Sequence, residues 1–204
     1  MNEYKIVILG NRYVGKSSLI KRYIDGTFSN DQFFCMVQGV RVNSKTINYN
    51  DQSIKLNLYD ISGAERFGGI SLVQSHCIGA VGAIIMFDIT RLGTFDGVKM
   101  WKKILDEVAP TIPTILLANK FDIFGEIHGD HFDSLYEVIN SNNLSKFCKD
   151  NEIIESFDTS AKNNINIDGA MNFLVNCIIG SMVTNDNENN NDNDDCNSEI
   201  HICI

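Results

Sequence analysis

The stretch GNRYVGKS, residues 10–17, decides the fold of this chain. It follows an apolar run at residues 5–9 and opens a segment whose apolar residues have helical spacing. It matches GxxxxGK[ST], the pattern of a phosphate-binding loop (P-loop) between a strand and a helix. The glycines let backbone N–H groups turn towards a phosphate chain, and the helix N-terminus adds a favourable partial charge. A chance Gly-rich turn is the alternative, but strand, motif and helix stand in the required order.

The P-loop predicts specific contacts with a nucleotide. Lys16 would reach the β- and γ-phosphates, and the hydroxyl of Ser17 would bind Mg²⁺. The predicted nucleotide-binding residues of this segment are Asn11, Arg12, Tyr13, Val14, Gly15, Lys16, Ser17 and Ser18.

Apolar runs and helical stripes alternate along the rest of the chain. The expected strands cover residues 5–9, 54–59, 81–87, 114–118 and 153–157, with helical stripes before Gly26, over residues 98–108 and over residues 170–178. Continuous apolar strands alternating with amphipathic helices indicate an α/β fold with a mostly parallel sheet. The segment 41–53 has the pattern of an antiparallel hairpin turn at one edge of the sheet.

Length and composition suit one globular domain with a substantial core, because the 204 residues are 44% hydrophobic and 21% charged. We expect this domain over residues 1–183. Residues 123–143 occupy a place where a compact α/β domain needs only a short link, which predicts an insertion with its own short helix. The run NDNENNNDNDD, residues 185–195, cannot bury apolar surface. We therefore expect residues 184–204 to be a disordered acidic tail.

The formal net charge of −9 is unevenly spread, since six acids and no Lys or Arg lie beyond residue 183, leaving about −3 on the domain. An acidic balance argues against nucleic acid as the main partner. The six cysteines form no CxxC pair, which favours reduced thiols in a cytoplasmic protein. No run approaches the roughly 18 apolar residues of a membrane span, so we expect a soluble protein.

Two later motifs predict which base is bound, since kinases and ATPases share the P-loop. They are NKFD at residues 119–122 and TSAK at residues 159–162, each at the C-terminal end of an expected strand. Open α/β sheets bind ligands at that edge. A carboxylate such as Asp122 accepts two parallel hydrogen bonds from guanine N1–H and its exocyclic amine, and adenine lacks this donor pair. The motifs therefore predict a guanine nucleotide.

Together these motifs resemble the Ras superfamily of small GTPases over about residues 4–182. The segments TFSN, WKKI and DISGAERF look Rab-like, whereas IIMFDITRLGTFDGVKMW and LANKFDIF are also similar to the fungal Tem/Spg-type GTPases that start septation signalling. The resemblance implies a small G domain, with a six-stranded, mostly parallel sheet, one antiparallel edge strand and helices on both faces. It implies a switch that binds GTP or GDP with Mg²⁺ and meets effectors, exchange factors or GTPase-activating proteins in membrane traffic or related signalling.

The resemblance also assigns roles in the site. Ser17 and Asp60 are the metal residues, with Asp60 acting through a water, and Gly63 offers a backbone amide to the γ-phosphate. The residues around the base are Asn119, Lys120, Asp122, Ser160, Ala161 and Lys162. Phe28 matches an aromatic that packs edge-on against the guanine, and a plain core Phe is its alternative.

Three departures from the family bear on catalysis. Cys35 stands where the family has a Mg²⁺-binding Thr, and a thiol is a poor ligand for a hard cation. Ala64 replaces the Gln that orients the attacking water, so we expect no catalytic side chain. Arg12 and Tyr13 stand where Ras proper has Gly, and a side chain at 12 would obstruct an arginine finger from a partner. A finger supplied by Arg12 itself is the alternative.

These departures predict a guanine-nucleotide switch that hydrolyses GTP slowly unless a partner supplies the missing groups. The alternative is a pseudo-GTPase that holds nucleotide as structural support. The altered switch I favours that alternative, but the retained Lys16, Ser17, Asp60 and Gly63 oppose it. A P-loop kinase lacks visible acceptor-site chemistry and conflicts with NKFD.

Membrane attachment stays open at this stage. The last four residues are HICI, and neither Cys196 nor Cys203 stands four from the end, so the C-a-a-X prenylation pattern fails. The acidic tail would also be repelled by anionic lipid. Ordinary tail cysteines are the expectation, and an atypical lipid anchor on the cytosolic face of a membrane is the alternative.

Overall fold

The computed structural model describes residues 1–29, 39–62, 69–127 and 130–191. The strands are β1 (Asn2–Gly10), β2 (Gly39–Tyr49), β3 (Gln52–Ser62), β4 (Gly82–Asp88), β5 (Thr114–Asn119) and β6 (Glu155–Thr159). The helices are α1 (Lys16–Asp25), α3 (Gly69–Cys77), α4 (Gly93–Asp106), the 3-10 helix η2 (Phe121–Glu126), α5 (Asp130–Ile139), α6 (Ser141–Asp150) and α7 (Ile167–Asn191). Each apolar run predicted as a strand overlaps one of these strands.

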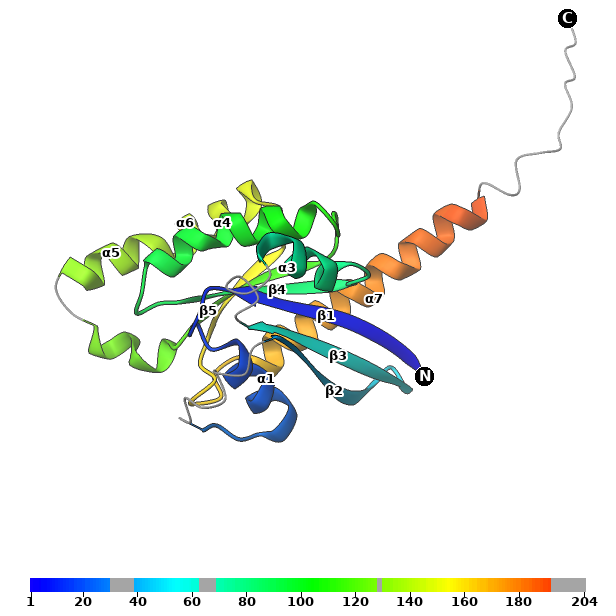
Figure 1. Cartoon of the computed structure of the whole chain (residues 1–204), viewed down its shortest axis with the longest axis horizontal. Helices are drawn as coiled ribbons and strands as arrows, with labels where there is room; N and C mark the ends of the chain where they lie inside the picture. The colour runs from blue at the N-terminus through cyan, green and yellow to red at the C-terminus, as the bar shows by residue number, and fades with distance from the viewer. Residues whose placement is uncertain (30–38, 63–68, 128–129, 192–204) are drawn as a thin grey trace, which may run out of the picture.

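The strands form one sheet in the order β2-β3-β1-β4-β5-β6, with helices on both faces (Figure 1). The edge pair β2–β3 of this sheet is antiparallel, and its other neighbouring strand pairs are parallel. This confirms the predicted α/β fold: a six-stranded, mostly parallel sheet with one antiparallel edge strand. The β2–β3 hairpin turns at Asn50 and Asp51, whose positive φ angles of 46° and 62° suit a two-residue turn between twisted strands.

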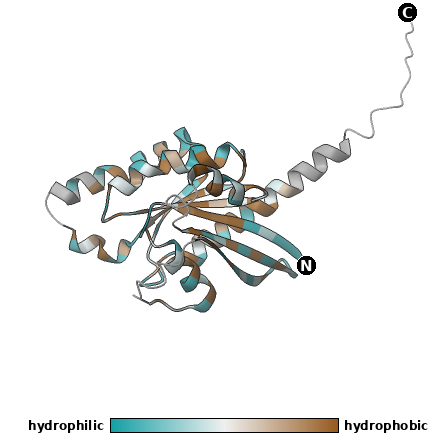
Figure 2. Ribbon diagram, viewed as in Figure 1, coloured by the Kyte–Doolittle hydropathy of each residue, from teal (hydrophilic) through white to brown (hydrophobic). Residues whose placement is uncertain are grey.

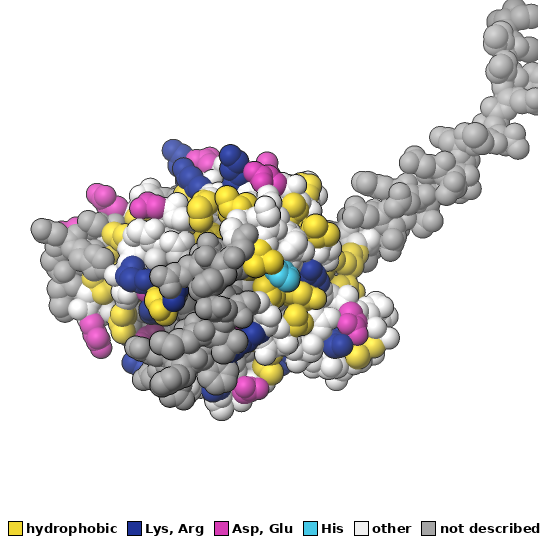
Figure 3. Space-filling model, in the orientation of Figure 1, with side chains coloured by type: hydrophobic (Ala, Val, Ile, Leu, Met, Phe, Trp, Pro, Cys, Tyr) yellow, Lys and Arg dark blue, Asp and Glu magenta, His cyan; other side chains and the backbone are white. Residues whose placement is uncertain are grey.

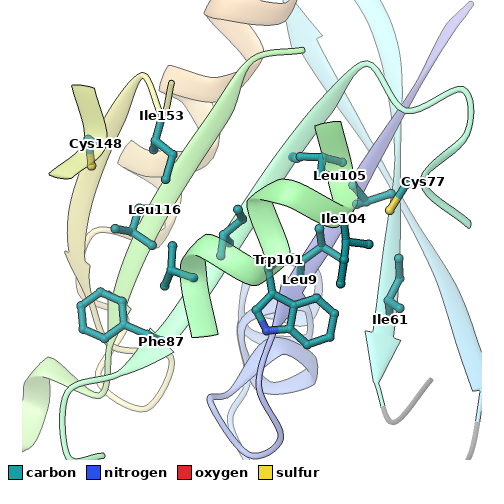
Figure 4. Packing of buried hydrophobic residues seen from close by; sticks show 14 of the residues in the cluster. Leu9, Ile61, Cys77, Phe87, Trp101, Ile104, Leu105, Leu116, Cys148 and Ile153 are labelled. Atoms are coloured by element: carbon teal, nitrogen blue, oxygen red, sulfur yellow. The ribbon is translucent and has the colours of Figure 1, made fainter. Parts of the chain in front are cut away.

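The core lies in two layers, one on each face of the sheet. Helices α3, α4, α5 and α6 cover one face, where Phe87, Trp101 and Leu105 are buried together (Figure 4). Helices α1 and α7 cover the other, where Ile20 and Leu174 are buried. Every residue of β4 and β5 is buried, because both of their faces are covered. Figure 2 shows these central strands as mostly hydrophobic and the helices with mixed faces.

The structure differs from the sequence-based expectations at two element ends. We expected a strand over residues 54–59, but β3 runs to Ser62 because Asp60 pairs with Arg41 of β2 and Ser62 with Gly39. Helix α7 runs to Asn191, whereas we expected a disordered tail from residue 184. Extending a formed helix gains a hydrogen bond for each residue it fixes, so a helix can outlast its apolar stripe. Residues 192–204 lie outside the described residues.

Three further features complete the description of the fold. Helix α5 lies within residues 123–143, the segment predicted as an insertion with its own short helix. Among the described residues, no helix combines the length and the apolar character needed to cross a bilayer. Basic and acidic side chains are interspersed on the face shown in Figure 3, so neither charge dominates the described residues visible there.

Candidate nucleotide-binding site

The predicted motifs meet at one edge of the sheet, where the parallel strands end. Register places Ile8 of β1 beside Asp60, Gly10 beside Met86, Asp88 beside Asn119, and Asn119 beside Thr159. The P-loop, NKFD and TSAK therefore follow strands that end side by side. Parallel strands bring their C-terminal loops to a common edge, which is where α/β sheets bind ligands.

Both glycines of the P-loop motif are required by close packing. Gly10 has φ 139°, and a Cβ there would lie 2.3 Å from the carbonyl oxygen of Met86. Gly15 has φ 105°, and its Cβ would lie 2.3 Å from Nδ2 of Asn119. Any other residue at either position would be strained and would push the loop away from the strands beneath it.

Lys16 begins α1 and lies inside the P-loop, where only 4% of the residue is exposed. Its Nζ donates to the carbonyl oxygens of Gly10, at 2.6 Å, and Asn11, at 3.0 Å. Ser18 follows it in the first turn of α1. A buried ammonium is stable only where hydrogen bonds replace its water. Its position beside the first N–H groups of a helix makes the loop attractive to a phosphate.

Ser17 and Asp60 bring two oxygen-bearing side chains together. The Ser17 hydroxyl donates to Oδ2 of Asp60, a carboxylate that is only 2% exposed. A cavity of about 100 Å³ adjoins the pair and is also lined by Arg41 and Asn43 of β2. Mg²⁺ prefers hard oxygen ligands and usually takes one or two from protein while keeping waters and phosphate oxygens. The hydroxyl and the carboxylate fit that requirement.

Asn119 ties the P-loop to the TSAK loop. Its Nδ2 donates to the carbonyl oxygen of Val14 at 2.8 Å, and its Oδ1 accepts the backbone N–H of Ala161 at 3.2 Å. The residue is 2% exposed, and Val14 is fully buried. One side chain thus fixes the distance between the loop predicted to hold phosphate and the loop predicted to hold the base.

Asp122 has a fixed carboxylate orientation. Its Oδ1 accepts the hydroxyl hydrogen of the buried Ser160 at 2.6 Å, and Nζ of Lys162 lies 3.7 Å from its Oδ2. The Asp122 side chain is only 6% exposed. A buried acid that keeps acceptor capacity selects a ligand with donors, because an adenine would leave it unpaired.

Comparison with known proteins decides the family. The family model of the Ras family matches residues 5–179. This chain belongs to the Ras family.

Similar relatives of this Ras-family chain are Rab proteins. It is 40% identical over 183 residues to Ras-related protein Rab-32A of Dictyostelium discoideum, covering 86% of this chain and 78% of the relative. It is 38% identical over 191 residues to Ras-related protein Rab-32 of Homo sapiens, covering 91% and 79%. The Rab-like interpretation is confirmed, and the similarity to septation-type GTPases stays a prediction.

Lys120 of this Ras-family chain pairs with Asp88, a residue that sequence reasoning missed. Lys120 Nζ lies 2.6 Å from Oδ2 of Asp88, which also accepts Nε of Arg91 at 2.9 Å. Burial alone would raise the pKa of Asp88, but the hydrogen bonds from Lys120, Thr90 and Arg91 outweigh it and hold that pKa below its ordinary value. Its sequence signal was an acid directly after an apolar run, as Asp60 follows the apolar run predicted at residues 54–59.

Arg22 is a second residue that the sequence did not single out. From α1 it donates to the carbonyl oxygens of Ala161, at 2.8 Å, and Lys162, at 2.7 Å. It also donates to the carbonyl of Gly26 at 2.5 Å, just before the partly buried Phe28. Arg22 therefore joins the TSAK loop to the segment that carries Phe28.

Arg12 and Tyr13 form the exposed rim of the P-loop. Nη2 of Arg12 donates to the Tyr13 hydroxyl at 2.9 Å, and the guanidinium carbon lies 4.8 Å from the centre of the Tyr13 ring. Tyr13 has φ 62°, a conformation that costs a non-glycine residue energy. The predicted roles of Cys35, Gly63 and Ala64 fall outside the described residues.

Proposed function

We propose that this chain is a guanine-nucleotide switch that binds GTP and GDP with Mg²⁺ and hydrolyses GTP slowly. The observation that carries the proposal is the pair of hydrogen bonds by which the Asn119 side chain joins Val14 to Ala161. These bonds link the loop that would hold phosphate to the pocket that contains Asp122. An ATPase or a kinase needs the cradle but not the buried, oriented Asp122. Membership of the Ras family supports the same conclusion.

The residues of the chain would divide the work of binding. Lys16 and the helix N-terminus would receive the phosphates, and Asp122 would accept the guanine donors while Ser160 holds its orientation. Ser17 and Asp60 would hold Mg²⁺, which when bound offsets negative charge on the phosphate oxygens. Phe28 and the Ala161–Lys162 backbone would border the base.

Slow hydrolysis follows from Ala64. Phosphoryl transfer to water depends on positioning and electrostatics, and Ala64 cannot orient a water. The GTP-bound state would then last until a partner supplies the missing group. Effectors and the partner that supplies this group would meet the protein at a membrane, because its similar relatives are named as Rab proteins. We propose membrane traffic as its setting and peripheral attachment as its mode.

The test begins with the nucleotide that co-purifies with the protein. We expect bound GDP or GTP, tight binding of guanine but not adenine nucleotides, and single-turnover hydrolysis well below that of a Gln-containing relative measured beside it. Tight ADP binding would overturn the guanine assignment. A rate equal to that of the relative would overturn slow hydrolysis alone.

A pseudo-GTPase is the second candidate, and Cys35 at the position of the switch I Thr favours it. Such a protein would hold nucleotide without sensing the γ-phosphate or the metal. Its GTP and GDP affinities would be equal, and removal of Mg²⁺ with EDTA would leave both unchanged. A switch that uses Ser17 and Asp60 should instead lose affinity for both nucleotides in EDTA.

A further inference from the structure

Helix α4 and the turn before it contact Asn11 and Arg12 of the P-loop through two hydrogen bonds. Nε1 of Trp101 donates to Oδ1 of Asn11 at 2.7 Å. Nη2 of Arg91, just before α4, donates to the carbonyl oxygen of Arg12 at 2.7 Å. We call the set Asp88, Arg91, Gly97 and Trp101 the α4 anchor. We propose that the α4 anchor positions the P-loop and thereby sets the rate of nucleotide release, an inference that rests on the proposed nucleotide binding.

Of the two residues in this hydrogen bond, Trp101 is the one held in place by the core. It is 2% exposed and packs in the core layer beneath α4, near Leu9 and Ile104 (Figure 4). A buried indole N–H needs an acceptor, and an unpaired one is costly. The indole cannot follow a moving loop without disturbing the core, so the bond holds Asn11 against the helix.

Gly97 makes room for this contact. A Cβ at Gly97 would lie 2.5 Å from Oδ1 of Asn11, too close for that atom to stay in place, and 3.1 Å from its Cγ, a tight contact. Glycine inside a helix is less stable than alanine. At this position, therefore, glycine stands in place of the more stabilising alanine, and the space it leaves is filled by the Asn11 side chain of the P-loop.

Arg91 is the second link, and Asp88 holds it. The Arg91 side chain is 43% exposed, but its Nε bonds to Oδ2 of the fully buried Asp88 at 2.9 Å. That fixes the direction of the guanidinium while its other end holds the Arg12 carbonyl. Asp88 also pairs with Lys120, so the α4 anchor connects the P-loop to the NKFD motif.

A pre-formed P-loop binds phosphate without first having to be ordered. Ordering a loop on binding opposes affinity, so holding it in advance strengthens binding. Affinity differences among variants of one site appear mostly in the dissociation rate. Loss of the α4 anchor should therefore speed release of GDP and of GTP alike, since both contact the same loop.

The central test compares two glycines of one helix. Gly97→Ala should displace Asn11, whereas Gly93→Ala should not disturb the P-loop, because a Cβ at Gly93 meets nothing within 4 Å. Release of fluorescent GDP into excess unlabelled GDP should be about 3- to 10-fold faster for G97A, the effect of one net hydrogen bond. G93A should release GDP at the wild-type rate.

A purely structural role for Gly97 makes a different prediction. Alanine is the better helix former, so hydrogen exchange of the α4 amides should be equal or slower in G97A while nucleotide release is faster. The chain has one tryptophan, so its single indole N–H resonance reports the contact directly. That resonance should move upfield in G97A and stay in place in G93A.

Two further variants complete the design. Trp101→Phe removes the donor and keeps a ring, and G97A/W101F should release GDP no faster than the faster single variant. Arg91→Ala, at an exposed site, tests the second link while Asp88 keeps its bonds to Lys120 and Thr90, and it should also speed release. Wild-type rates in G97A and R91A, with GDP bound normally by the wild type, would overturn the α4 anchor alone. A wild type that binds no guanine nucleotide would overturn the proposed function and the anchor with it.

Discussion

Arg22 of α1 donates to the carbonyl oxygen of Ala161, a residue 139 positions later, at 2.8 Å. The same guanidinium reaches Lys162 and Gly26, so three backbone carbonyls from two segments converge on one side chain. A planar group with five donors in fixed directions suits this task, and an ammonium does not.

Arg22→Ala should therefore loosen the base pocket. Hydrogen bonds from a charged donor contribute about 1.5–3 kcal/mol each when buried, and the partial exposure of Arg22 reduces this. We expect GDP affinity to fall by about tenfold in calorimetric titration. R22K should recover little of it, because Lys cannot bond three carbonyls in the same geometry. Lys103→Ala removes a positive charge from an exposed position on α4 and should leave GDP affinity unchanged.

Ser160→Ala should weaken guanine selection. The variant removes the hydroxyl that fixes Asp122 and leaves the carboxylate present but less oriented. One hydrogen bond corresponds to about 1 kcal/mol, so GDP affinity should fall roughly fivefold. ADP affinity, which we expect to be weak, should stay the same, so the ratio of GDP affinity to ADP affinity should fall. Equal losses for GDP and ADP would instead mean that Ser160 supports the loop as a whole.

Tyr13→Gly should stabilise the P-loop. The φ of 62° is strained for Tyr and ordinary for Gly, a difference of about 1 kcal/mol. The lost contact with Arg12 is exposed and offsets about half of that. Denaturant unfolding without nucleotide should show a gain of about 0.5 kcal/mol. Tyr13→Phe keeps the strain and should show no gain.

Cys77 should make folding stability fall at alkaline pH. Burial raises the pKa of this thiol from 9.0 to about 11, and the charge of Lys5 offsets only part of the rise. The folded state therefore disfavours the thiolate, so the stabilising effect is complete below pH 9 and declines between pH 9 and 11. Cys77→Ala should flatten the pH dependence of the unfolding free energy in that interval. A slope unchanged by C77A would assign the alkaline decline to other groups, such as Tyr23.

Ala64→Gln should raise GTP hydrolysis. Restoring a side chain that can orient water should increase the single-turnover rate by on the order of tenfold or more. Ala64→Leu adds bulk without a polar group and should not. A64Q with the wild-type rate would place the deficiency elsewhere, with Cys35 the first candidate.

The parts of the molecule that the sequence predicted correctly depend on local patterns. The P-loop is eight consecutive residues, and the buried strands are short apolar runs, so neighbours along the chain carry the signal. The bond between Asn11 and Trp101 joins residues 90 positions apart, and that of Arg22 to Lys162 joins residues 140 apart. Such contacts depend on how α1 and α4 lie against the sheet, which one sequence does not state. The predicted end of β3 was wrong for the same reason, because pairing with β2 extends the strand to Ser62.

The direction of helix α7 determines from which side of the domain a C-terminal tether would hold the molecule. It starts beside the edge that carries the P-loop and runs back past the opposite edge, projecting beyond the sheet (Figure 1). Its 25 residues span about 37 Å at the rise of an α-helix. A tether joined beyond Asn191 would therefore pull from the side facing away from the P-loop edge. A large protein could dock on the P-loop edge while the C-terminus is held, without the two competing for space.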